Sequence, residues 1–153
     1  WDVSVVLKFL QTCPDNIDLS RKQLSAKLTL LLCLVSCKRV SDVRALDLEG
    51  RHYTPEGVSF LITRSTKSAS THMSFPELPG DPKLCVVRCL QEYERQTSSL
   101  RQATSRHLLI LLVHPHASVS CPTLARWVKW LLSEADKDTS IFGALSNRGA
   151  VVS

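Results

Sequence analysis

The feature that most constrains this fold is an apolar run from Leu24 to Val35 that leads into the basic pair Lys38-Arg39. Apolar residues recur at helical spacing through the run, which is typical of a helix buried in a protein core. A shorter helical pattern follows over residues 40–47. We therefore expect Arg39 to lie at a junction between two helices. A guanidinium held still at such a junction can bind a phosphate or a carboxylate in bidentate fashion.

A simpler interpretation of the same residues is that Lys38 and Arg39 are solvated cations at a helix C-terminus. Cations in that position stabilise the negative end of the helix dipole by up to about 1 kcal/mol. The local sequence alone favours this simpler interpretation. The case for an anion-binding Arg39 therefore depends on the rest of the chain.

Basic residues are concentrated in one part of the chain. The whole chain has 19 Lys+Arg against 14 Asp+Glu, a net charge of +5. Residues 20–51 hold Arg21, Lys22, Lys27, Lys38, Arg39, Arg44 and Arg51 against only Asp42, Asp47 and Glu49. A locally basic surface suits a polyanion, with nucleic acid as the first choice. A mildly basic, solvated surface is the equal alternative.

The length and composition predict one globular domain over residues 1–153, with 44% hydrophobic and 22% charged residues. The longest apolar run, residues 28–35, is too short to span a bilayer, so we expect no membrane association. The opening Trp1-Asp2-Val3 lacks a basic n-region, so no signal peptide is expected. The missing initiator Met and the abrupt ending predict a piece of a longer protein.

The cysteine spacing favours free thiols. Cys33/Cys37 and Cys85/Cys89 are i,i+4 pairs within helical patterns, and Cys33 sits in an apolar run where a cysteine behaves as a small hydrophobe. A reducing, intracellular compartment fits this pattern. The two pairs, together with His114-Pro115-His116, also offer zinc ligands, although tight zinc knuckles use shorter spacings. A zinc-binding helical domain is thus an alternative, and the leading interpretation has no metal and no small-molecule cofactor.

The predicted elements give a mainly α fold with a small antiparallel β-sheet. Asp2 is a candidate cap for a first helix, and Ser20 to Gln23 has the capping-box pattern that opens a second. Residues 51–57 are expected to form a turn-rich connection, and residues 58–63 and 71–75 a pair of returning strands.

The second half of the chain is predicted to be largely helical. Asp81-Pro82 predicts a helix start, with the helix continuing to about Thr97. Residues 108–113 are a buried strand or a core run, which periodicity cannot separate. A further helix opens at 120–122 with Trp127 on its apolar face, and a last loop is expected to enter a helix near Ser146.

Three motifs in this order resemble the catalytic domain of tyrosine recombinases, and in detail the versions in DIRS-type retrotransposons and related eukaryotic mobile elements. The motifs are Cys37-Lys38-Arg39-Val40-Ser41-Asp42-Val43-Arg44-Ala45-Leu46, Asp81-Pro82-Lys83-Leu84-Cys85-Val86-Val87-Arg88 and Asp138-Thr139-Ser140-Ile141-Phe142. A predicted strand pair lies between the first two, and the resemblance spans essentially the whole chain. It implies the fold of the DNA breaking-rejoining catalytic core, with duplex DNA as the partner.

The resemblance also implies roles for three cations. In the family, two arginines bind the non-bridging oxygens of the scissile phosphate, a hairpin lysine protonates the leaving oxygen, and a tyrosine is the nucleophile. Arg39 matches the first arginine, Arg148 the second, and Lys67 the hairpin lysine, with Arg64 as the other choice. Prepositioned cations of this kind stabilise the charge of the transition state more than that of the ground state.

The sequence departs from the family at two points. Leu145 occupies the histidine position of the His-x-x-Arg motif, and the sequence stops before the family's nucleophile. Tyr53 and Tyr93, expected in a loop and in the middle of a helix, are in the wrong places to replace it. The resemblance therefore implies a DNA recombination or integration domain that is truncated before the nucleophile region and inactive as given, so enzyme activity is left open.

The resulting hypothesis is a nuclear, DNA-binding, recombinase-like domain from a mobile element, which binds duplex DNA and forms homo-oligomers on it. Leu145 and the modest net charge leave a second interpretation open. In that interpretation, the chain is a catalytically dead protein-interaction module derived from such an element.

Overall fold

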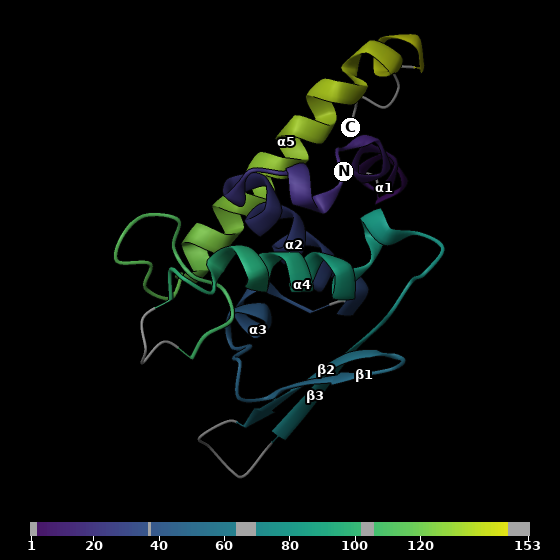
Figure 1. The fold of residues 1–153 in the computed structure, drawn as a ribbon. Coiled ribbons are helices and arrows are strands. Elements are labelled where there is room, and N and C mark those ends of the chain that lie inside the picture. Colours follow the sequence, from purple (N-terminus) through teal and green to yellow (C-terminus); the bar gives the residue numbers. More distant parts are fainter. Residues whose placement is uncertain (1–2, 37, 64–69, 102–105, 147–153) are drawn as a thin grey trace.

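The computed structural model describes residues 3–36, 38–63, 70–101 and 106–146, with the backbone alone for 63, 70–71 and 137–146. Across these residues the chain forms five α-helices and one three-stranded antiparallel sheet (Figure 1). The helices are α1 (Val3–Thr12), α2 (Arg21–Ser36), α3 (Val40–Arg44), α4 (Val86–Thr97) and α5 (Cys121–Ser146). The strands are β1 (Arg51–Thr54), β2 (Gly57–Thr63) and β3 (Ser70–Pro76), and two short 3₁₀ helices are η1 (Asn16–Asp18) and η2 (Pro82–Leu84). The prediction of a mainly α fold with a small antiparallel sheet is confirmed.

Helix α2 is the centre of the core, because its apolar residues face neighbours on several sides. Leu24, Leu28 and Leu32 have no exposed surface. The helix packs against both α5 and α4, and it also contacts α3 and β3. Figure 1 shows the sheet at one end of the molecule, beyond α3 and α4, with α1 at the other end beside α5. The apolar run that dominates the sequence thus becomes the element around which the others pack.

The start of α2 is set by the predicted capping box. The Gln23 backbone N–H donates to Ser20 Oγ at 3.2 Å, and the Ser20 N–H donates to Gln23 Oε1 at 2.9 Å. Each contact satisfies a backbone donor that has no partner within the helix. This reciprocal pair confirms the helix start that the sequence predicts.

The sheet contains the predicted strand pair and one strand that the sequence analysis missed. Strands β2 and β3 pair antiparallel, with Val58 opposite Phe75 and Phe60 opposite Met73, and all four side chains are buried. The expectation of a turn-rich connection over 51–57 is wrong, because residues 51–54 form β1 and pair with β2. Tyr53 therefore lies on a strand and not in a loop, and only the tight Thr54–Gly57 turn remains of the predicted connection.

The segment that follows the sheet enters α4 in two steps. Pro82 is the first residue of η2, a single 3₁₀ turn, and α4 begins only at Val86, because Cys85 has extended backbone angles of −84° and 121°. The expected helix start at Asp81-Pro82 is thus a short separate turn. Helix α4 ends at Thr97, as predicted.

The prediction of a buried strand or core run over residues 108–113 holds for residues 108–110 only, because Leu111 and Leu112 are partly exposed and Val113 is 68% exposed. Leu108, Leu109 and Ile110 are almost completely buried, and Ile110 makes only an isolated bridge to Ser118. The Ile110 N–H donates to the hydroxyl of buried Tyr93 at 3.0 Å. This bond fixes the segment against α4.

Helix α5 is much longer than predicted. It begins at Cys121, as expected, and buries Trp127 at 7% exposure, but it continues without a break to Ser146. The expected loop over residues 141–145 is therefore wrong, because these residues belong to α5, and the residues after Ser146 lie outside the described part of the chain. No proline follows Pro122 in the helix, so no residue removes a backbone hydrogen bond along its length. Among the described residues, no helix is both long enough and apolar enough to cross a membrane.

Candidate nucleic-acid interface

Arg39 lies at the junction between α2 and α3, where its backbone N–H and carbonyl are both hydrogen-bonded to α3. Helix α2 ends at Ser36, and α3 begins at Val40, so Arg39 occupies the N-cap position with extended angles of −84° and 164°. Its N–H donates to Asp42 Oδ2 at 3.2 Å. Val43, with no exposed surface, anchors α3 in the core. The sequence prediction that the third helix starts at or just after Arg39 is confirmed.

The side chain of Arg39 is exposed, and among the described residues no carboxylate forms an ion pair with it. The neighbouring Lys38 is exposed as well, and none of the described ion pairs includes it. Two adjacent cations on a fixed backbone are therefore available to an external anion. An arginine in this setting suits phosphate, because its planar fork can donate two parallel hydrogen bonds.

The other predicted site residues lie outside the part of the chain that the structure describes. Lys67 and its alternative Arg64 fall in residues 64–69, and Arg148 falls in residues 147–153. The described backbone places Leu145 in the last turn of α5. Of the three cations predicted to share one phosphate, the structure thus gives the position of Arg39.

Arg44 has a structural role that the sequence analysis did not assign. It is the last residue of α3, and its Nε–H donates to the Val119 carbonyl at 2.9 Å. This bond ties α3 to the segment that leads into α5. Burial lowers the pKa of nearby His107, and the positive charge of Arg44 lowers it further. The position of Arg44 at the end of a short predicted helix was the only sequence signal for such a contact.

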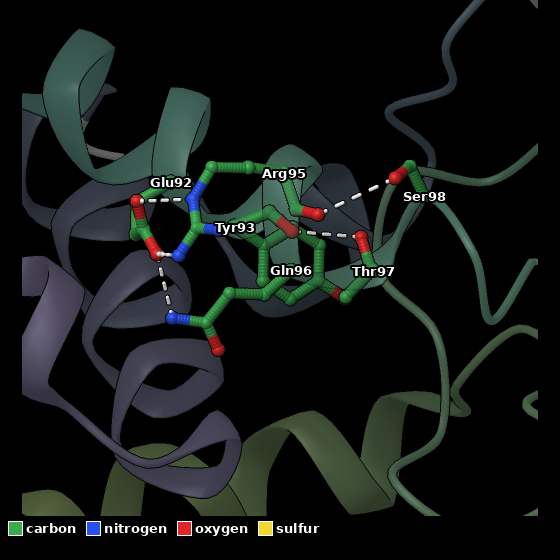
Figure 2. A network of polar contacts seen from close by, with 6 residues as sticks. All are labelled: Glu92, Tyr93, Arg95, Gln96, Thr97 and Ser98. Atoms are coloured by element: carbon green, nitrogen blue, oxygen red, sulfur yellow. Dashed lines mark hydrogen bonds and ion pairs between the residues drawn. The ribbon is translucent and has the colours of Figure 1, made fainter.

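Most described cations downstream of α3 are already paired with carboxylates. The ion pairs are Arg51–Glu94 at 2.6 Å, Lys83–Asp15 at 4.0 Å, Arg88–Glu77 at 3.2 Å, Arg95–Glu92 at 2.5 Å and Arg106–Glu49. Figure 2 shows Arg95 extending along α4 to both carboxylate oxygens of Glu92. By contrast, Arg21, Lys38 and Arg39 are exposed and take part in none of these pairs. Lys38 and Arg39 at the candidate site are therefore among the cations that no described carboxylate neutralises.

Neither tyrosine of the sequence is placed to act as a nucleophile. Tyr93 is buried within α4, where its hydroxyl accepts a hydrogen bond from the Ile110 N–H. Its carbonyl accepts a second hydrogen bond from the Thr97 hydroxyl (Figure 2). The Tyr53 hydroxyl donates to Glu94 at 3.0 Å. Burial raises the pKa of both phenols, and the charge of Glu94 raises that of Tyr53 further. Both groups are thereby held in the protonated form, which is the poor nucleophile.

The described residues contain no cluster of three or more His, Cys, Asp or Glu side chains that would hold a metal ion. Cys37, one of the four cysteines proposed for a zinc site, lies outside the described residues. Burial raises the pKa of the Cys33 thiol to about 11 and that of Cys89 to about 12. Protonated thiols are poor metal ligands, so these two favour a packing role.

The comparisons with known proteins give no match to a protein-family model, to a curated protein or to a solved structure.

Proposed function

We propose that this chain is a DNA-binding domain of the tyrosine-recombinase type, which uses Arg39 to bind a backbone phosphate of duplex DNA. The observation that carries the proposal is the geometry of Arg39: a fixed backbone between two packed helices, an exposed guanidinium and no carboxylate partner among the described residues. The order of a buried helix, an arginine, a short helix and an antiparallel sheet also supports the proposal, because the resemblance in sequence implies that order.

The same proposal assigns no cleavage activity to the chain as given. Leu145 can neither donate nor accept a proton at the position where the family has a histidine. Tyr53 and Tyr93 are both engaged in internal hydrogen bonds. Lys67 and Arg148 are proposed to complete the phosphate site with Arg39. The function is then binding, in a nuclear setting and with homo-oligomers formed on DNA, and strand transfer is not part of it.

Duplex binding and its salt dependence test the proposal. Fluorescence anisotropy of labelled duplexes of unrelated sequence should show affinity that falls steeply between about 50 and 200 mM salt, because counterions are released from the phosphates. Arg39→Ala should weaken binding to every sequence to the same degree and reduce the salt slope by about 1. Affinity that is independent of salt would contradict a phosphate-based interface.

Arg95→Ala is the matched control for Arg39→Ala. It removes the same charge from an exposed arginine, but Arg95 is on α4 and is already paired with Glu92. If both variants lose the same affinity, net charge and not the α2–α3 junction determines binding. If only Arg39→Ala binds more weakly, the junction is the interface.

A second candidate function is a protein-interaction module. The observation that favours it is the pairing of Arg51, Lys83, Arg88, Arg95 and Arg106 with carboxylates, which leaves few free cations on α4 and the sheet. Recovery of protein partners with no shift of any duplex in a gel would select this candidate over DNA binding.

A further inference from the structure

The loop between Leu111 and Ala117 is a compact turn that presents two histidines. The Leu111 N–H donates to the Ala117 carbonyl at 2.7 Å, and the His116 N–H donates to the Val113 carbonyl at 2.8 Å. The bridge between Ile110 and Ser118 closes the base of the loop. The loop is therefore held by its own backbone, and its histidines are not among the residues proposed to bind phosphate.

His116 is oriented as a metal-binding histidine is. Its Nδ1 lies 2.9 Å from the Leu111 carbonyl oxygen, which can only accept, so Nδ1 carries the proton. The other ring nitrogen, Nε2, is then left with its lone pair. Metal-binding histidines almost always donate their second ring N–H to a carbonyl or a carboxylate in this way. The backbone of His116 has a φ of 59°, a left-handed conformation that the loop imposes on a non-glycine residue.

His114 is close enough to share an ion with His116. The two ring centroids are 6.1 Å apart, with an angle of 75° between the planes. Zinc–nitrogen bonds of about 2.0–2.1 Å in tetrahedral geometry place two imidazole centroids about 5 Å apart. His114 is exposed and makes no described hydrogen bond, so its ring can rotate to close the difference of about 1 Å.

We propose that His114 and His116 chelate a divalent transition-metal ion of the class that prefers imidazole, with Zn²⁺ as its representative. Two protein nitrogens leave the remaining positions to water, so the site is open and exchangeable, unlike a closed structural zinc site. The described residues offer no third ligand there. The proposal does not depend on DNA binding, and it differs from the four-cysteine site considered from the sequence.

Site-resolved titration with zinc chloride tests the site. The imidazole nitrogens of all five histidines are followed by ¹H–¹⁵N NMR at about pH 7.5, where metal does not compete with excess protons. The expected result is that the signals of His114 and His116 move together at substoichiometric zinc, ahead of those of His52, His72 and His107. Magnesium chloride at the same concentration should leave all five unchanged, because Mg²⁺ prefers oxygen ligands.

Three variants separate chelation from single-ligand binding. His114→Gln and His116→Gln should each weaken zinc binding by roughly 10²-fold, because losing one ligand removes the high effective concentration of the pair. His72→Gln is the matched control, since His72 is also exposed but lies on β3. A titration in which the two histidines respond independently, or in which His72→Gln weakens binding equally, would overturn the proposal. Circular dichroism confirms that each loop variant is folded.

Discussion

The hydroxyl of Tyr53 donates a hydrogen bond of 3.0 Å to one carboxylate oxygen of Glu94, whose other oxygen forms an ion pair of 2.6 Å with Arg51. The Arg51 guanidinium also lies 5.2 Å from the centroid of the Tyr53 ring. Tyr53 and Arg51 are on β1, whereas Glu94 is on α4. The cluster is therefore a polar link between the sheet and the helical part of the molecule.

Removing the Tyr53 hydroxyl should destabilise the protein with little change in fold. Tyr53→Phe keeps the ring beside Arg51 but removes the donor to Glu94, and we expect a loss of about 1 kcal/mol in the free energy of unfolding. Urea unfolding followed by circular dichroism measures this loss. The exposed Thr54→Ser exchange on the same strand is a control that should change the stability much less. An unchanged midpoint for Tyr53→Phe would show that water replaces the bond without cost.

The alkaline range gives an independent check on the same contact. Burial raises the pKa of Tyr53 above its ordinary value of 10.0, so the folded state holds the proton more tightly than the unfolded state. A raised pKa contributes stability that is complete below pH 10 and is lost as the pH rises further. As the pH rises above about 10, the free energy of unfolding should therefore fall less for Tyr53→Phe than for the wild-type chain.

Lys27 should be replaceable by an apolar residue with a gain in stability. Its Nζ donates to Asn16 Oδ1 at 2.7 Å, but the residue is only 1% exposed, and burial lowers its pKa. The charged amine thus carries a desolvation cost that one neutral hydrogen bond does not cover. Lys27 also lines a hollow of about 50 Å³ between α1, α2 and α5, which gives a methionine side chain room. Lys27→Met should raise the free energy of unfolding at pH 7 by about 1 kcal/mol.

The pH dependence distinguishes this desolvation effect from better packing. A lowered pKa contributes stability that is present above the unfolded value of 10.5 and is lost as the pH falls through the folded value. The advantage of Lys27→Met should therefore shrink as the pH approaches 10.5. If Lys27→Met raises the free energy of unfolding by the same amount at pH 7 and at pH 10.5, better packing alone explains the gain.

Local signals in the sequence predicted those parts of the fold that local interactions determine. The capping box at Ser20 and the buried helix after Leu24 depend on residues a few positions apart, and β2 and β3 are consecutive strands in the chain. Strand β1 was missed because four residues with one large apolar side chain carry little strand signal, and its pairing with β2 determines its conformation. The length of α5 was missed because Gly143, in the segment after Ile141, is typical of a loop when packing is unknown.

The candidate site was predictable only in part, because some of its features depend on contacts between residues far apart in the sequence. The location of Arg39 followed from two helical patterns that meet at one residue. Its lack of a carboxylate partner did not, because ion pairs such as Arg51–Glu94 and Arg106–Glu49 join residues far apart in the sequence. The His114–His116 pair was visible as a possible ligand motif, but the contact of His116 with the Leu111 carbonyl required the loop conformation.

Removing the capping box should weaken α2 at its first turn. Ser20→Ala deletes the acceptor for the Gln23 N–H, and we expect a loss of about 1 kcal/mol in the free energy of unfolding, measured by urea titration. Ser20→Asp retains an acceptor at the cap and should restore most of the stability. Equal losses for the two variants would mean that the cap hydrogen bond does not stabilise the helix.

Strands β2 and β3 approach so closely at Gly57 that we expect no other residue to fit at this position. A Cβ atom added at Gly57 would overlap the Phe75 carbonyl oxygen and would lie 2.9 Å from the Pro76 Cα, both of which are backbone atoms of the paired strand. Backbone cannot move aside as a flexible side chain does, so Gly57→Ala should lower the free energy of unfolding by roughly 2–4 kcal/mol. Gly80→Ala is the matched control, because a Cβ there meets no atom within 4 Å. Thermal unfolding of both variants decides the matter, since comparable midpoints would show that the strands separate easily at this point.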